Sequence, residues 1–143
     1  MDLNGNMPMK KFYNIGEQYA LLFLFMFDFS DILCYTLIKN REKEVIMNKI
    51  NFWYKFNAAE MEGTKGIRTC AKNLFEEWKD DVIKVTDLVM CINHKSWDWN
   101  DKNNSQLMEL YADLYYKYYN KALDYFEEQG NKDAVNYFLR TLD

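Results

Sequence analysis

The sequence predicts an all-α protein: a long antiparallel helical hairpin with a short C-terminal helix and an N-terminal arm or helix. Apolar side chains recur every three or four residues from Ile67 to Phe126, in two stretches separated by the polar cluster Asn100–Asn104. This spacing places one apolar stripe along each helix, and two such helices joined by a short turn can pack together. One proline and five glycines in 143 residues leave long helices uninterrupted.

The first helix of the hairpin is expected to run from Ile67 to about Asp98, and the second from about Ser105 to Gln129. The predicted core stripes consist of Phe75, Trp78, Val82, Val85, Val89 and Ile92 in the first helix, and Leu107, Tyr111, Leu114, Tyr118, Ala122 and Tyr125 in the second. The polar face of the first helix carries six charged residues, Lys72, Glu76, Lys79, Asp80, Lys84 and Asp87. We interpret these charges as a solvated face and not as a functional site.

Polar caps and glycines indicate where the other elements begin and end. In residues 50–56, one apolar or aromatic set alternates with Asn51, Trp53 and Lys55, which indicates weak strand periodicity or an extended arm. Asn57 with Glu60 three residues later has the form of a capping box, so a helix is expected to start there. Gly63 and Gly66 then predict either a helix break or a close crossing of two backbones.

The second half of the chain carries clearer signals of the same kind. Asn104 or Ser105 can cap the second helix of the hairpin, and Gly130 fits the position just after its end. Asn131 can then cap a last short helix that contains Phe138.

Residues 1–46 form an apolar N-terminal extension to a helical domain at residues 47–143. Its most apolar window, Tyr19–Ile38, has the length of a membrane span, but Asp28 and Asp31 would each cost roughly 2.5–3.5 kcal/mol at a bilayer centre. Three interpretations stay open: a membrane or interfacial helix, a helix that packs on the domain, and upstream sequence preceding a start at Met47. Residues 43–47 back-translate to a purine-rich ribosome-binding sequence before a start codon, which favours the third interpretation.

Composition limits the class of function. The formal net charge is −4 and the pI is about 5.1, so nucleic-acid binding driven by counterion release is disfavoured. The three cysteines, Cys34, Cys70 and Cys91, are an odd and widely spaced set that forms no disulfide framework. A reducing, cytoplasmic location fits this cysteine usage best.

No group of residues reaches the pattern of a catalytic or metal site. His94 lies one helical turn after Cys91, but two ligands do not hold a structural zinc ion. A single histidine also excludes the paired Glu-x-x-His motifs of a di-metal bundle. We therefore predict a protein that is not an enzyme, with no metal, no cofactor and no catalytic residues.

Aromatic residues, 17% of the chain, supply the preferred functional hypothesis. Tyr116 and Tyr119 are expected to point outward from the second helix, and Trp97 and Trp99 lie at the turn of the hairpin. Because Tyr and Trp favour interfaces, we predict a non-catalytic interaction module for an unknown protein partner. Exposed parts of the stripes would also allow homodimerisation.

Two alternatives use other residues. Lys65, Arg68 and Lys72, near the start of the first helix, would carry nucleic-acid binding, which the acidic balance makes the weaker hypothesis. The window at residues 19–38 would anchor a membrane-associated protein.

Several short segments carry a family resemblance. They are Asn57–Arg68, Phe75–Trp78, Leu88–Met90, Asn93–Lys95 and Tyr137–Asp143. In these segments the chain, from about residue 51 to 143, resembles a family of small uncharacterised helical proteins of phages and prophages of low-GC Gram-positive bacteria. The resemblance implies a phage or prophage accessory protein and supplies no catalytic residues.

Overall fold

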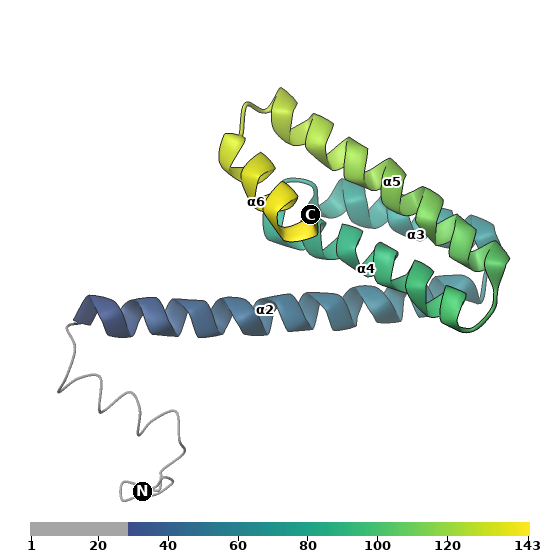
Figure 1. The fold of residues 1–143 in the computed structure, drawn as a ribbon, viewed down its shortest axis with the longest axis horizontal. Helices are drawn as coiled ribbons and strands as arrows, with labels where there is room; N and C mark the ends of the chain where they lie inside the picture. Colours follow the sequence, from purple (N-terminus) through teal and green to yellow (C-terminus); the bar gives the residue numbers. More distant parts are fainter. Residues whose placement is uncertain (1–28) are drawn as a thin grey trace, which may run out of the picture. The chain divides into compact units, whose positions relative to one another are not determined.

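The structure, a computed structural model, describes residues 29–143. This part of the chain is all-α, as predicted, and consists of five helices, labelled as in Figure 1. They are α2 (Phe29–Glu60), α3 (Gly63–Trp78), α4 (Val82–Asp101), α5 (Ser105–Glu128) and α6 (Lys132–Leu142).

By its internal contacts the chain divides into two units, Met1–Lys43 and Glu44–Asp143. The boundary lies within α2, whose helical backbone continues across Met47. In the first unit, every side chain from Leu33 to Asn40 is exposed. Among the described helices, none combines the length and apolarity that a membrane crossing requires. Half of the predicted membrane window, residues 19–28, lies outside the described part of the chain.

In the second unit, α4 and α5 form the predicted antiparallel hairpin (Figure 1). The cap between them is Asn104, whose Oδ1 accepts a hydrogen bond from the backbone N–H of Leu107 at 3.1 Å. Gly130 follows α5 with a positive φ, and Asn131 caps α6 by accepting from the N–H of Ala134 at 3.1 Å. These predicted boundaries are confirmed, and α6 packs against both helices of the hairpin.

The prediction of one continuous helix from Ile67 to Asp98 is wrong, because this segment is divided between α3 and α4. Asp81 adopts an extended backbone conformation, and its Oδ1 accepts from the N–H of Lys84 at 3.1 Å. This N-cap starts a new helix, which lets α3 contact both α4 and α5. The apolar spacing of three and four residues continues across the break, so periodicity alone does not reveal it.

Residues 50–56 form the C-terminal part of α2, so the N-terminal element is the predicted helix and not the strand or extended arm that the alternation also allowed. Asn57 therefore lies inside a helix and caps nothing, which corrects the predicted capping box. Gly63 begins α3 with φ +82°, and a Cβ on Gly66 would meet the backbone oxygen of Ala59 at 2.7 Å. The glycine pair thus marks both a helix break and a close crossing, as predicted.

One hydrophobic core joins the helices of the second unit, with Phe52 and Phe56 of α2 packed among residues of α3 to α6. Its other fully or nearly buried members include Ile67, Ala71, Leu74, Phe75, Val85, Leu88, Val89, Ile92, Leu110, Tyr111, Leu114, Tyr118, Ala122, Phe126 and Phe138. Burying each large apolar side chain contributes about 1.5–3 kcal/mol, so this cluster fixes the positions of the surfaces described below.

Candidate functional site

Helix α4 carries polar and aromatic residues on two different faces. Asp87 and Lys95 lie on the face that α2 covers, where both are buried. Asn93, Trp97 and Asn100 follow one another at helical spacing on another face, beside α5. The first set of side chains is paired inside the protein, whereas the second set borders solvent.

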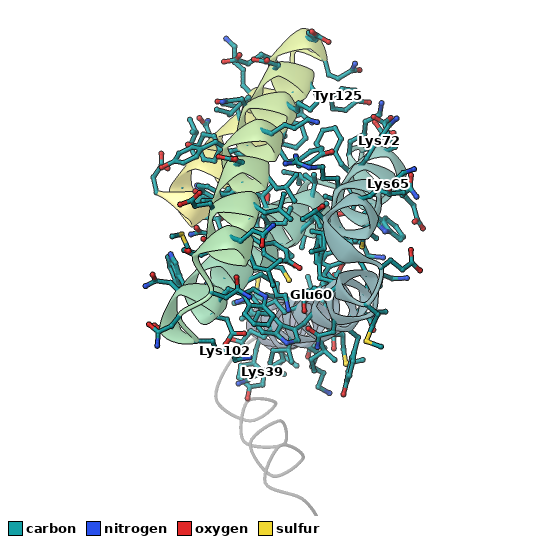
Figure 2. The ribbon with its side chains drawn as sticks, turned by 90° about the vertical axis from the view of Figure 1, so that its right-hand side faces the viewer. Lys39, Glu60, Lys65, Lys72, Lys102 and Tyr125 are labelled. Carbon is teal, nitrogen blue, oxygen red and sulfur yellow. The ribbon has the colours of Figure 1, made fainter. Side chains whose placement is uncertain are left out.

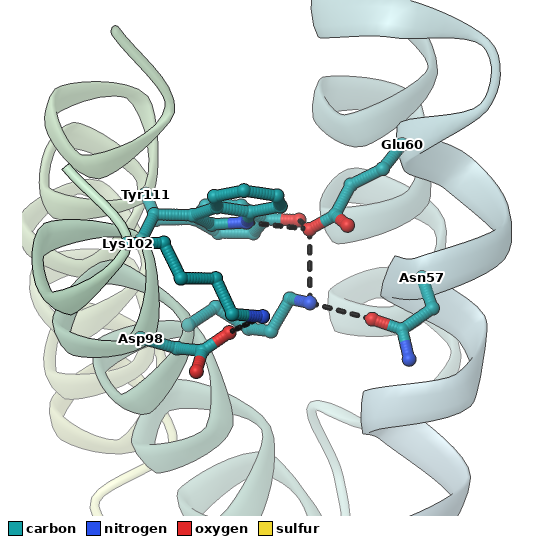
Figure 3. Close-up of polar contacts among 7 residues, drawn as sticks. Asn57, Glu60, Asp98, Lys102 and Tyr111 are labelled. Carbon is teal, nitrogen blue, oxygen red and sulfur yellow. Dashed lines mark hydrogen bonds and ion pairs between the residues drawn. The ribbon is translucent and has the colours of Figure 1, made fainter. Parts of the chain in front are cut away.

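The first face holds a buried lysine. Lys95 is only 1% exposed, and its Nζ lies 2.9 Å from Glu60 Oε2. The same ammonium donates to Asn57 Oδ1 at 2.6 Å (Figure 3). It also lies 4.4 Å from the ring centre of Trp53. All three partners belong to α2, so this one side chain ties α4 to α2.

Two further donors converge on the same carboxylate oxygen of Glu60 (Figure 3). The indole N–H of Trp99 donates to it at 3.0 Å, and the hydroxyl of Tyr111 donates at 2.5 Å. Burial by itself would raise the pKa of Glu60, but the hydrogen bonds from Tyr111, Trp99 and Lys95 outweigh it and lower the pKa. Burial, and then the Glu60 carboxylate, raise the pKa of Tyr111. We give one name, the Lys95–Glu60 cluster, to the group formed by Lys95, Glu60, Trp99, Tyr111, Trp53 and Asn57.

A second buried polar contact joins α2 to α4. The Asn48 side-chain amide donates to Asp87 Oδ2 at 3.0 Å, and Asp87 is 2% exposed. Burial raises the pKa of Asp87 to about 6, although the hydrogen bond from Asn48 opposes this. The prediction that Asp87 belongs to a solvated face is therefore wrong, because α2 covers this part of α4.

Between α4 and α5 lies a groove of about 320 Å³. Its lining residues are Asn93, Ser96, Trp97, Asn100, Met108, Ala112, Tyr115 and Tyr116, and none of them is charged. We call it the α4–α5 groove. Trp97 is 58% exposed and lies against His94 with the two rings tilted by 39°, while Tyr116 is 66% exposed and meets the Tyr115 ring edge-on. Trp97 and Tyr116, both predicted interaction residues, thus line one surface.

The other two predicted interaction residues lie elsewhere. Trp99 is half-buried and donates to Glu60 in the Lys95–Glu60 cluster. Tyr119 packs against Phe138 with ring centres 5.2 Å apart, and its hydroxyl donates to Asp143 at 3.0 Å. Both side chains are thus used for contacts within the protein.

Two residues of the groove were not predicted from the sequence. The side-chain amides of Asn93 and Asn100 have no hydrogen-bond partner within residues 29–143. They lie seven residues apart, with Trp97 between them, so they mark the two ends of the groove on α4. The signal in the sequence that could have identified these two residues is their helical spacing on either side of Trp97.

The residues of the nucleic-acid alternative, Lys65, Arg68 and Lys72, are exposed on α3. Figure 2 shows Lys65 and Lys72 on the outer side of that helix. In the described part of the chain, none of the three forms an ion pair. A groove of about 540 Å³ beside Lys65 is also lined by Glu62 and Glu77, so the local charge is mixed.

The residues that could bind a metal do not converge. Across residues 29–143, no three His, Cys, Asp or Glu side chains come close enough together to hold a metal ion. His94 lies against Trp97, and burial lowers the pKa of His94.

Comparisons of the chain with protein-family models, with curated proteins and with solved structures find no match.

Proposed function

We propose that the protein is a non-catalytic interaction module that binds a protein partner through the α4–α5 groove. The observation that carries this proposal is the pairing of two exposed aromatic side chains, Trp97 and Tyr116, in one groove without charged residues. Tyr, Trp and Met are enriched at protein interfaces, and charged residues are depleted from their centres. The unpaired amides of Asn93 and Asn100 add polar groups that a partner can satisfy.

The biological setting of the proposal comes from the sequence resemblance. We propose a phage or prophage accessory protein that acts in the cytoplasm, with a phage or host protein as its partner. A second copy of the chain is the simplest alternative partner. Sedimentation of the full chain distinguishes the two, because homodimerisation through the groove doubles the mass and requires Trp97.

The test is affinity capture with the full chain as bait, followed by measurement of binding to each captured protein in purified form. We expect one partner to bind the native chain and to lose at least about tenfold in affinity when Trp97→Ala and Tyr116→Ala are combined. Tyr54→Ala is the matched control, because Tyr54 is 70% exposed but lies on α2, outside the groove. Equal binding by the groove variant and the control would contradict the proposal.

A second candidate function is supported by the three unpaired cations on α3. Lys65, Arg68 and Lys72 recur at helical spacing, which suits contact with a polyanion such as single-stranded nucleic acid. Such binding should weaken steeply with salt and disappear when the three residues are replaced by alanine. Absence of binding to labelled single-stranded DNA and RNA at low salt would remove this candidate.

A further inference from the structure

We infer that a second copy of this chain packs antiparallel against the outer face of α2, about a two-fold axis beside Ile50. This inference is independent of the proposed function, because none of the residues that carry it lines the α4–α5 groove. It follows from three features of the second unit: a row of exposed apolar side chains on α2, a hollow beside that row, and two charges of opposite sign along one edge of it.

Exposed apolar side chains concentrate on the solvent face of α2. Seven large apolar side chains are exposed in residues 44–143, and four of them lie on this one helix. They are Ile46, Met47, Ile50 and Tyr54, with exposed fractions from 44% to 70%. Because they are spaced by three and four residues, they share one face, which we call the α2 stripe. Exposed apolar side chains that gather in one patch, unlike scattered ones, are typical of interaction sites.

The α2 stripe has the ridge and the hollow that helix packing requires. Ile46, Ile50 and Tyr54 form one i, i+4 row, and the commonest crossing of two helices packs such rows into each other's grooves. Beside this row is a hollow of about 420 Å³, lined by Lys49, Ile50, Trp53 and Tyr54. In an antiparallel pair centred on Ile50, Ile46 of one copy lies opposite Tyr54 of the other, since each is four residues from the axis. The Ile46 side chain can then enter the hollow of the second copy.

Charge makes the α2 stripe complementary to itself. Glu44 and Lys55 are eleven residues apart, which is about three helical turns, so both lie along the same edge of the stripe. Both are exposed, and neither forms an ion pair within the described part of the chain. An antiparallel pair brings the same edges together, so a two-fold axis near Ile50 places Glu44 of each copy opposite Lys55 of the other. A two-fold interface between identical subunits requires this self-complementarity.

The same charges distinguish a second copy from a membrane surface. Amphipathic helices that bind membranes are rich in Lys and Arg on the polar face, whereas Glu44 at the edge of the stripe would be repelled by anionic lipid. Lys49, on the opposite edge, would approach its own copy near the axis, but its flexible stem lets the ammonium turn to solvent. The stripe and its edges therefore fit a second copy better than a lipid headgroup layer.

The experiment is sedimentation velocity of the full chain from about 1 to 500 μM. The contact involves fewer residues than the roughly 20–30 per side of a standard interface, so we expect a weak dimer with a Kd of about 10–100 μM. Ile50→Asp should raise this Kd at least about tenfold, because it places a carboxylate from each copy at the axis. Tyr116→Asp is the matched control, since Tyr116 is 66% exposed but lies on α5, and it should leave the Kd unchanged. Circular dichroism confirms that each variant is folded.

Charge reversal tests the antiparallel arrangement itself. Glu44→Lys alone, or Lys55→Glu alone, places like charges opposite each other at both ends of the contact, so each should raise the Kd about fivefold. The two substitutions together restore opposite charges across the interface, so the double variant should return to within about twofold of the native Kd. Both positions are exposed, so these variants keep the fold.

Three results would overturn the inference: a chain that stays monomeric at every concentration, a dimer that survives Ile50→Asp, or a double variant that dimerises as weakly as the single ones. A monomeric chain that binds vesicles of anionic lipid through Ile50 would assign the stripe to a membrane surface instead. A dimer that is lost in Tyr116→Asp but kept in Ile50→Asp would place the contact in the α4–α5 groove.

Discussion

Trp97 and Trp99 are two residues apart on the same helix, yet they have opposite environments. The indole of Trp99 is half-buried and donates to Glu60, whereas Trp97 is 58% exposed and lies against the His94 ring. Tyr111 and Tyr116 on α5 repeat this contrast, because Tyr111 is buried and bonded to Glu60 while Tyr116 is exposed. The difference comes from α2, which covers one face of the hairpin and leaves the α4–α5 groove open. The same residue types therefore stabilise the fold on one face and are exposed on the other.

The largest effect should come from the covered face. Lys95→Met removes the ammonium but keeps most of the side-chain volume, so Glu60 and Asn57 lose a buried partner. We expect a loss of about 3 kcal/mol in the free energy of unfolding, measured with urea. Lys102→Met is the control, because the Lys102–Asp98 pair is exposed and should contribute less than about 1 kcal/mol. Equal losses in the two variants would contradict the contrast between the faces.

The second test uses the buried carboxylate of Asp87. Its pKa is raised to about 6 in the folded protein from an ordinary value of 3.8, so folding favours the protonated form. Burying the charged carboxylate therefore lowers the free energy of unfolding most above pH 6, and this loss of stability becomes smaller as the pH falls toward 4. Asp87→Asn should raise the free energy of unfolding by as much as about 3 kcal/mol at pH 7, and by less than about 1 kcal/mol at pH 4.

Unfolding in urea at the two pH values measures this difference. Asp113→Asn, which replaces an exposed carboxylate of α5, should shift stability by less than about 0.5 kcal/mol at either pH. A loss of stability for Asp87→Asn at pH 7 would mean that the carboxylate is needed in its charged form.

A smaller effect compares the two tyrosines directly. Tyr111→Phe deletes a hydroxyl that donates to a carboxylate, so it should cost about 1.5–2 kcal/mol. Tyr116→Phe deletes an exposed hydroxyl and should change stability by less than about 0.5 kcal/mol. Thermal unfolding of both variants at one pH suffices, and similar melting temperatures would show that the Glu60 bond adds nothing.

The smallest effect on stability is expected in the groove itself. Trp97→Ala and Tyr116→Ala should each change the free energy of unfolding by about 0.5 kcal/mol or less, because both side chains are largely exposed. Tyr119→Ala should cost about 1–2 kcal/mol, since its ring packs on Phe138. A large decrease in the free energy of unfolding of Trp97→Ala, measured by urea titration, would show that Trp97 stabilises the fold.

The all-α class and the caps at Asn104 and Asn131 could be predicted because each depends on local sequence. Helical periodicity and the capping preference of asparagine act over a few residues. The break at Asp81 was missed because the apolar spacing continues through it. At residues 50–56 the sequence left a strand, an arm and a helix open, because side chains that alternate along the chain can also belong to a helix that is covered on one side. At Asp81 a local cap starts the new helix, whereas at residues 50–56 the burial of Phe52 and Phe56 in the core favours the helix.

The site was predictable in part for the same reason. The exposure of Tyr116 could be predicted because its position on α5 points away from the apolar stripe. The exposure of Trp97 could be predicted because it lies near the turn of the hairpin. The contacts of the Lys95–Glu60 cluster and the Asn48–Asp87 contact join residues 35 to 51 positions apart. Their pairing depends on how α2 docks, which no local pattern encodes.

The crossing of α2 and α3 sets different mutational tolerances for two nearby glycines. At Gly66 any side chain would begin with a carbon 2.7 Å from the Ala59 oxygen, so saturation mutagenesis should recover glycine alone. At Gly63 a Cβ meets nothing within 4 Å, and only the backbone angle restricts the residue. Asparagine and aspartate tolerate that angle and should be accepted there. The sequence of this connection can therefore drift at its first glycine while the second stays fixed.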